Sequence, residues 1–341
     1  MNATTFGVDI AKNVFQVHWV EDTTGEICRR KLARGKVREF FAKRAEARVV
    51  MEACGGAHHW ARELMALGHR VELLPPHEVR KFVSGNKDDA ADARAIWLAA
   101  QHPDVRRVAP KSAQQQAELS VHRVRSHWMQ VRTSTINALR GLLYELGVVL
   151  PKGRRIALRQ LAVQRSHIEQ QLPAVLVQLL DAQLQALRAL DEQIAALEAQ
   201  IEVVQRSSEV AQRLRQVPGI GLLGATALAA TLGDGSAWRG AREFACCMGL
   251  TPRHTGTGGK VRMGGISKRG DAYIRTLLIH GARNLVRCAK PSPWIAQMLA
   301  RRPFNVVATA VAHKLARTAW ARAAHGTAWQ PGHRAGVVAA A

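Results

Sequence analysis

Four acidic residues in the first hundred positions have the types and spacing needed to bind divalent metal ions. Asp9 ends an apolar run, Glu52 follows the apolar run Val49–Met51, and Asp89 and Asp92 lie three residues apart at the start of a helical segment. A carboxylate directly after a buried run is costly unless it is solvated, paired or bound to a metal. Carboxylate oxygens suit Mg²⁺, and many phosphoryl-transfer enzymes hold two such ions about 3.5–4 Å apart. The pattern therefore predicts a site for Mg²⁺, with two ions expected.

Each of these carboxylates also has an ordinary structural explanation. An aspartate at a helix start often only compensates the helix dipole or caps the first turn, and this applies to Asp89. Asp88 competes with Asp89, because it lies four residues from Asp92 and can share a helix face with it. The joint occurrence of the four, along an alternation of strands and helices, is more specific than any one of them.

The first hundred residues alternate apolar, β-branched runs with helical segments. Ala11-Lys12-Asn13 separates the first two runs and predicts a tight turn between paired strands. The predicted elements, in chain order, are strands at Thr5–Ile10, Val14–Val20 and about Ile27–Leu32, a helix at Val37–Ala47, a strand at Arg48–Ala53, a helix at His59–Leu67 and a strand at Arg70–Leu74. Three strands followed by helix, strand, helix and strand is the order of an α/β ribonuclease-H-like domain.

Two long helices follow and predict a helical connector. Ser112 is a good N-cap for a helix that runs to about Gly147, and Pro151 closes it off. In the second helix, apolar residues alternate by three and four positions, as in a coiled coil: Leu187, Leu190, Ile194, Leu197, Ile201 and Val204. This seam fits a helical hairpin that packs on itself and an intermolecular coiled coil equally well.

After Pro218 the sequence predicts a mostly helical C-terminal domain. A basic, glycine-rich stretch, Arg253–Gly270, is expected to form a flexible loop, and helices are expected at Ala272–Ala289 and about Val306–Ala324. The tail from His325 is rich in Gly, Pro and Ala and is expected to fray. The predicted division is 1–110 for the catalytic α/β domain, 111–210 for the connector, 211–325 for the C-terminal domain and 326–341 for the tail.

The charge balance predicts a polyanionic partner. The chain has 49 Lys and Arg against 26 Asp and Glu, which gives a net charge of +23. Nucleic acid is the commonest partner of such a protein, although charge names a partner and not an activity. Glycine backbone amides and basic side chains can cradle phosphates together. The residues expected to contact nucleic acid are Arg253, Lys260, Arg262, Lys268 and Arg269 in the glycine-rich stretch, and Arg123 and Arg125 on the long helix.

The composition argues against a membrane or secreted protein. Asp9 and Lys12 interrupt any apolar run at the N-terminus, so no signal peptide is expected. The uncharged stretch Val217–Leu232 contains Pro218 and is too short and too broken for a membrane span. The five cysteines are odd in number and lack Cys-x-x-Cys spacing, which favours reduced thiols over a zinc site. We expect a cytoplasmic protein.

Several motifs resemble those of the insertion-sequence-110 (IS110) family of DEDD transposases, from about residue 5 to about residue 325. In the first domain they are Gly7–Lys12, Met51–Gly55 and Lys87–Arg94, and further along they are Val217–Gly221, Gly249–Arg253 and Gly264–Gly270. The third motif of this family has the spacing Lys, one residue, Asp, two residues, Asp-Ala-Arg, which favours Asp89 over Asp88. The combination is specific, although each piece alone is weak.

The resemblance implies a mechanism and partners that composition does not reveal. It implies a RuvC-like N-terminal domain, a coiled-coil connection and a C-terminal domain that supplies a serine nucleophile for a covalent phospho-protein intermediate. It also implies bacterial DNA at the nucleoid as substrate, and an element-encoded, structured guide RNA that pairs with donor and target DNA. Since one nucleophile cuts one strand, we expect a dimer that pairs into a tetramer.

The nucleophile is where this sequence departs from the family. The stretch in which the family has its serine reads His254–Lys260 and contains no serine. Counting forward from Pro252 selects Thr257, whereas counting back from Ser267 can reach Gly256, so we predict Thr257, with Thr255 and Ser267 next. Two other functions remain open: a Holliday-junction-type nuclease, in which metal-activated water attacks, and a non-catalytic nucleic-acid-binding derivative.

Overall fold

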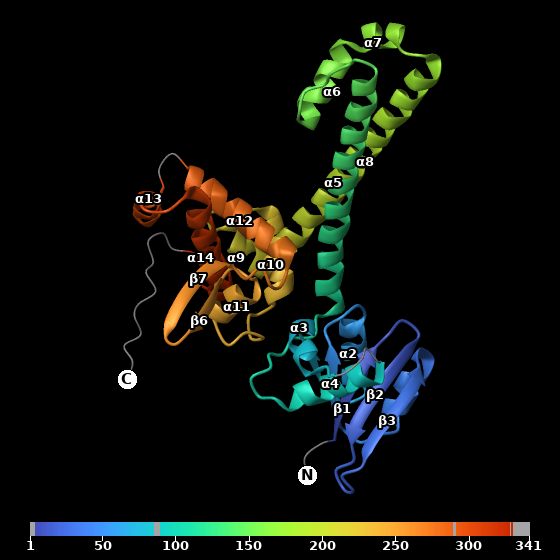
Figure 1. Ribbon diagram of the computed structural model, residues 1–341, viewed down its shortest axis with the longest axis vertical. Coiled ribbons are helices and arrows are strands. Elements are labelled where there is room, and N and C mark those ends of the chain that lie inside the picture. The colour runs from blue at the N-terminus through green and yellow to red at the C-terminus, as the bar shows by residue number, and fades with distance from the viewer. Residues whose placement is uncertain (1–3, 85–88, 289–290, 328, 330–341) are drawn as a thin grey trace. The chain divides into compact units, whose positions relative to one another are not determined.

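The structure is a computed structural model and describes residues 4–84, 89–288, 291–327 and 329, apart from the side chains of residues 89 and 90. The chain divides into two compact units, Met1–Gln116 and Ala117–Ala341. The first unit contains a five-stranded sheet, and the described part of the second is helical apart from a two-stranded hairpin (Figure 1). Among the described residues, no helix is long and apolar enough to cross a membrane.

The sheet of the first unit has the strand order β3-β2-β1-β4-β5. Its strands are β1 (Thr5–Ile10), β2 (Val14–Val20), β3 (Ile27–Ala33), β4 (Arg48–Glu52) and β5 (Arg70–Leu74). The first three form an antiparallel meander, and β4 and β5 run parallel to β1. The tight turn predicted at Ala11-Lys12-Asn13 is confirmed, because the Ala11 amide donates to the Val14 carbonyl oxygen at 3.2 Å.

Helices cover both faces of this sheet. The helical elements are α1 (Val37–Ala42), α2 (Ala57–Ala66), α3 (Pro76–Val79) and α4 (Asp89–Gln101), with short 3₁₀ turns at Arg34–Lys36 and Arg80–Phe82. Since side chains alternate across a strand, Phe6 and Val8 of β1 pack with α1 and α2 on one face. On the other face, Val50 of β4 packs with Ile96 of α4.

Gly7 lets α4 lie directly on β1. A Cβ atom built at Gly7 would lie 2.5 Å from the carbonyl oxygen of Ala93 and 2.7 Å from the amide nitrogen of Trp97. Only a residue without a side chain allows two backbones to approach this closely. The indole of Trp97 then donates to the Thr5 carbonyl oxygen at 3.1 Å, which fixes the helix along the strand.

A long helical hairpin begins the second unit. It consists of α5 (Ala113–Glu145), the short helices α6 (Arg154–Val163) and α7 (Arg165–Gln171), and α8 (Ala174–Ser207). The predicted N-cap is confirmed, because the Gln115 amide donates to Ser112 Oγ at 3.0 Å and Ser112 N donates to Gln115 Oε1 at 2.8 Å. Ion pairs of Arg125 with Glu198 and of Arg132 with Asp191 show that α5 and α8 run antiparallel.

The predicted seam of α8 is used within the chain. Leu180, Leu187, Ile194 and Ile201, spaced by seven residues, are buried in a single copy of the protein. Leu187 and Leu180 pack in one core with Ile136 and Leu139 of α5. Of the predicted seam positions, Leu187 therefore packs within the helical hairpin, and the intermolecular coiled coil stays a prediction.

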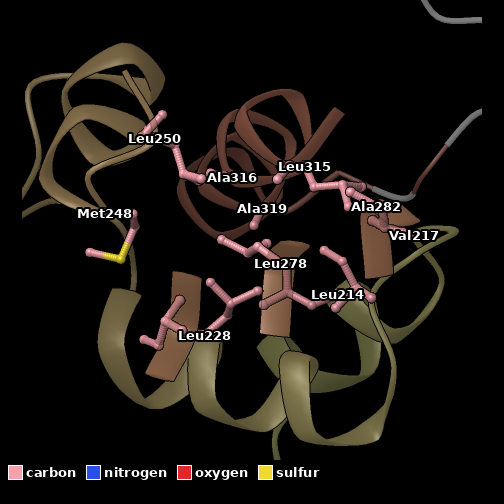
Figure 2. Packing of buried hydrophobic residues seen from close by; sticks show 14 of the residues in the cluster. Leu214, Val217, Leu228, Met248, Leu250, Leu278, Ala282, Leu315, Ala316 and Ala319 are labelled. Atoms are coloured by element: carbon pink, nitrogen blue, oxygen red, sulfur yellow. The ribbon is translucent and has the colours of Figure 1, made fainter. Parts of the chain in front are cut away.

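The rest of the second unit packs around small residues. Its helices are α9 (Glu209–Arg215), α10 (Leu222–Leu232), α11 (Ala241–Cys247), α12 (Ala272–Arg287), α13 (Pro293–Leu299) and α14 (Phe304–His325). Ala316 and Ala319 of α14 lie against Leu278 and Ala282 of α12 in the core (Figure 2). Small side chains allow these helices to pack closely, and Gly281 of α12 lies against the backbone of Gly219 for the same reason.

Several boundaries and one element differ from the sequence predictions. The first helix was predicted to reach Ala47 but ends at Ala42. The helix predicted from His59 begins at Ala57. The largest difference is in Arg253–Gly270, where we predicted a flexible loop. This stretch contains the hairpin of β6 (Pro252–Thr257) and β7 (Lys260–Ile266), because Gly258 and Gly259 form a two-residue turn.

Gly7→Ala should destabilise the first unit by about 1–3 kcal/mol, because the added methyl group meets backbone atoms that cannot rotate away. Hydrogen–deuterium exchange of peptides from β1 and α4 should show faster exchange in the variant. Gly35→Ala is the matched control, since a Cβ there has no atom within 4 Å. Equal protection of β1 and α4 in Gly7→Ala and the wild type would contradict this packing.

Candidate functional site

Asp9 and Glu52 lie side by side at one edge of the sheet. The parallel register of β1 and β4 pairs Val8 with Met51, so the next residue of each strand is an acid. By strand alternation, Asp9 shares the face of Gly7, which lies under α4, and Glu52 shares the face of Val50, which packs on α4. Both residues are half-buried. The sheet therefore brings together two residues that are far apart in the sequence.

Asp92 brings a third carboxylate to this edge from α4. Asp92 is half-buried, and it lies on the same stretch of α4 as Ala93 and Trp97, whose backbone atoms lie against Gly7. Burial and then the negative charge of Asp92 raise the pKa of Glu52, against an opposing effect of Arg80. A raised pKa is the expected effect of burial and of a nearby negative charge on a carboxyl group. The two carboxylates are thus close enough to repel each other.

Cys54 is a neighbour of the site that the sequence did not single out. Burial raises the pKa of its thiol, and the charges of Glu52 and Asp9 raise it further. Asp92 thus lies near enough to Glu52 to raise its pKa, and Asp9 and Glu52 both lie near enough to Cys54 to raise that of its thiol. The position of Cys54, two residues after a strand-ending acid, is the signal that could have placed it here.

The described residues include no group of three or more His, Cys, Asp and Glu side chains arranged to hold a metal ion. Asp88 and the side chain of Asp89 lie outside the described residues, so the fourth predicted ligand and its competitor are not compared. The described donors nevertheless fit a hard cation in their chemistry. They are carboxylate oxygens at a half-buried edge, and the raised pKa of Glu52 shows that this edge disfavours a further negative charge.

Thr257 lies at the tip of the hairpin in the second unit. It pairs with Lys260 across the turn, and Gly258 and Gly259 both have positive φ angles, of 58° and 80°. A two-residue turn of this kind needs glycine, which explains the sequence at this point. Thr257 is exposed, as is Thr255 two residues before it, whereas Ser267 is half-buried and its amide donates to the Thr251 carbonyl oxygen.

The basic residues predicted to bind nucleic acid lie on and just after this hairpin. Arg253, Lys260, Arg262, Lys268 and Arg269 are all exposed. Lys268 has a φ angle of 55°, and it is the one non-glycine residue with positive φ in the described part of the chain. Its amide donates to the Gly249 carbonyl oxygen at 3.1 Å, which holds this strained turn in place.

The two arginines predicted on α5 differ in their surroundings. Arg123 is exposed, whereas the side chain of Arg125 is 15% exposed and its Nε donates to Glu198 Oε1 at 2.8 Å. The guanidinium of Arg125 therefore joins α5 to α8. Of this pair, Arg123 is the one whose charge is fully presented to solvent.

Comparison with known proteins finds transposases along almost the whole chain. A DEDD transposase model of IS110 matches residues 6–147, and a model described as the transposase IS116/IS110/IS902 family matches residues 211–298. A probable family 20 transposase of Pseudomonas aeruginosa is 47% identical over 338 residues, which are 97% of this chain and 100% of that protein. The transposase of insertion sequence element IS1328 from Yersinia enterocolitica is 38% identical, over 96% of this chain and 98% of its own. The transposase of IS1111A from Coxiella burnetii is 35% identical, over 92% and 88% respectively.

The carboxylate edge should make the folded protein less stable at neutral pH. Because the pKa of Glu52 is raised by folding, the stabilising contribution of this group is fully present below its unfolded pKa of about 4.3 and is lost as the pH rises through the folded pKa. Glu52→Gln does not titrate. In metal-free buffer it should therefore melt at a higher temperature than the wild type at pH 7, and at the same temperature below about pH 4.

Glu72→Gln is a matched control with the opposite sign. Burial of Glu72 is outweighed by hydrogen bonds and charge from Arg48 and Arg107, which lower its pKa. Its contribution to stability is therefore present above the unfolded pKa, and Glu72→Gln should melt at a lower temperature at pH 7. A Glu52→Gln variant that melts below the wild type at pH 7 would show that the Glu52 carboxylate is stabilised by the fold, against our description of the edge.

Proposed function

Since this chain belongs to the IS110 family of transposases, we propose that it cuts and rejoins DNA through a covalent phospho-protein intermediate with the help of a four-carboxylate metal site. The protein is a transposase of an insertion sequence, an enzyme that acts on DNA. The observation that carries the proposal is the pairing of Asp9 and Glu52 at neighbouring strand ends, with the charge of Asp92 acting on Glu52.

The topology of the first unit supports a ribonuclease-H-like, and specifically RuvC-like, domain. A three-stranded antiparallel meander continued by two parallel strands gives the order β3-β2-β1-β4-β5. In this arrangement, the central strand β1 and its parallel neighbour β4 end at the same edge, where the acids lie. The catalytic domain predicted at 1–110 lies within the first compact unit, and the connector and C-terminal domain at 111–210 and 211–325 remain our proposed division.

Asp9, Glu52, Asp89 and Asp92 would hold Mg²⁺, as two ions. When bound, these ions would neutralise charge that develops on the scissile phosphate. The protein contributes two strand ends and one helix that fix the carboxylates in place. Burial and the negative charge of Asp92 raise the pKa of Glu52, which would make the edge receptive to positive charge.

The hydroxyl of Thr257 would act as the nucleophile. Its oxygen forms a bond to phosphorus while one phosphorus–oxygen bond of the DNA strand breaks, and the released sugar oxygen takes up a proton as the Thr257 hydroxyl loses one. A hydroxyl from a second DNA strand then attacks the same phosphorus and restores Thr257. Exposure of Thr257 at a hairpin tip supports this role, and basic groups including Lys260 and Arg262 would stabilise the charge that develops.

The remaining partners follow from the same mechanism. A nucleophile that cuts one strand requires several subunits for full exchange, so we propose a dimer that assembles into a tetramer. The seam Leu187–Val204 remains our proposed interface, because Leu190, Leu197 and Val204 are only half-buried within one chain. A guide RNA would bind through the exposed basic residues, Arg123 among them, because the chain carries a net charge of +23.

Thr257→Ala should remove the covalent protein–DNA adduct, whereas Thr257→Ser should retain or increase it, because serine offers the same oxygen without the methyl group that crowds its approach. The measurement is the adduct yield on denaturing gels, with Mg²⁺, DNA that carries the element ends, and the element RNA. Thr255→Ala is the matched control on the same strand and should leave the yield unchanged.

The other outcomes have definite meanings. An adduct that persists in Thr257→Ala and disappears in Thr255→Ala or Ser267→Ala would assign the nucleophile to that residue instead. Cleavage of DNA without an adduct in any variant would replace the covalent mechanism by a Holliday-junction-type nuclease that uses water. DNA binding with neither cleavage nor adduct, in the wild type and in Thr257→Ser, would identify a non-catalytic derivative.

A further inference from the structure

We propose that the face of the sheet beside Asp9 binds the backbone of the DNA strand that is cut, through a strip made by the amide of Gln16 of β2 and the basic side chains of Arg29 and Lys31 of β3, with Arg94 of α4 at its border. The inference rests on the proposed function, because it takes Asp9 as part of the cutting site. It assigns a DNA surface to the first unit, in addition to the basic hairpin of the second.

The register of the strands aligns this strip with the carboxylates. Asp9 lies opposite Gln16 in β2, and Gln16 lies opposite Lys31 in β3. One row further along the sheet, Gly7 lies opposite His18, and His18 opposite Arg29. Directly opposed residues of neighbouring antiparallel strands point to the same face. Gln16, Arg29 and Lys31 are therefore on the face that carries Asp9.

The helix that covers this face stops short of its outer strand. Trp97 of α4 packs edge to face against His18 of β2, with ring centroids 5.7 Å apart and the ring planes at 66°. Beyond β2 lies the edge strand β3 (Figure 1), on which both Arg29 and Lys31 are exposed. Arg29 and Lys31 thus lie at the border of the area that α4 covers, on the same face as Asp9.

Positive charges from both the sheet and the covering helix act on the side chain of His18. Its side chain is 2% exposed, and its Nδ1 has no hydrogen-bond partner among the described residues. Burial and then the positive charges of Arg29 and Arg94 lower its pKa. Positive charges from Arg29 of the sheet and Arg94 of the helix therefore both act on this buried ring.

The dimensions suit a nucleic-acid backbone that passes Asp9. Lys31 is two strands away from Asp9, a backbone separation of about 10 Å. Since the rise of duplex DNA is about 3.4 Å per nucleotide of one strand, a group at this distance is within a few nucleotides of the scissile phosphate. Amide and cationic groups on the strip can bind the phosphates that neighbour the scissile one. We assign the cut DNA strand rather than RNA, because the strip continues directly from Asp9.

Three adjacent positions of β3 provide the test. Arg30 is exposed like its neighbours but lies opposite Val17, whose side chain is in the core on the other face. Arg29→Ala, Arg30→Ala and Lys31→Ala each remove one positive charge from the same strand of the full-length chain. The measurement is the Kd of a fluorescein-labelled, 40-nucleotide single-stranded DNA of mixed sequence, in EDTA and over a range of salt concentrations.

Binding should alternate along the strand. Arg29→Ala and Lys31→Ala should each weaken Kd roughly fivefold and reduce the slope of log affinity against log salt by about 0.7, whereas Arg30→Ala should change neither. Equal effects at all three positions, or none at 29 and 31, would overturn the proposal. A loss confined to RNA of the same sequence would also overturn it and assign the strip to the guide.

The test separates the strip from the function on which it rests. Because EDTA prevents metal-dependent cleavage, the binding pattern is measured without reference to the reaction. Cleavage that survives Asp9→Asn would refute the proposed function even if binding alternates. Loss of cleavage in Asp9→Asn, with no alternation at positions 29 to 31, would refute the strip alone.

Discussion

The contact between β1 and α4 at Gly7 is the constraint on which the site depends. With a side chain at this position, α4 would be held away from the sheet, since the Ala93 oxygen and Trp97 nitrogen occupy the space of a Cβ atom. Asp92 belongs to the same stretch of helix and Asp9 to the same stretch of strand. The absence of one methyl group at residue 7 therefore lets a helix carboxylate approach a strand carboxylate.

This approach has an energetic consequence in a chain that is otherwise strongly basic. The net charge of +23 would favour ionised acids almost anywhere on the surface, yet the pKa of Glu52 is raised. By contrast, Glu72 on the adjacent strand is paired with Arg48 and Arg107. The sheet thus pairs Glu72 with two arginines, whereas burial and the charge of Asp92 raise the pKa of Glu52 at the carboxyl ends of the strands, as expected where a cation and a phosphate are to bind.

Local sequence patterns predicted much of the first unit, and contacts between distant residues explain what they missed. The bounds of β1, β2 and β5 agree with the prediction, because alternation and turn residues are local features. The β6–β7 hairpin was predicted as a loop, since its strands are rich in glycine and basic residues, and all of their residues except Ile266 are exposed. Its Gly258-Gly259 pair was the available signal. The seam of α8 showed its apolar spacing but not its partner, because a helix pattern does not identify the surface that it contacts.

The candidate site shows the same division. Its carboxylates were identified by type, spacing and resemblance, and the sheet brings Asp9 and Glu52 together as expected. Cys54 and the row from Asp9 through Gln16 to Lys31 were not identified, because they depend on the register between strands. Residues that are neighbours only across a sheet have no sequence spacing in common.

The central claim is that the carboxylates at this edge bind a divalent metal ion as a unit. Its most direct test is a titration with Mn²⁺, followed by electron paramagnetic resonance, on the full-length protein with its DNA. We predict that the wild type and Asp88→Asn bind Mn²⁺ tightly and that Asp9→Asn and Asp92→Asn each lose this binding. The account would be contradicted if Asp9→Asn and Asp92→Asn bound Mn²⁺ as tightly as the wild type.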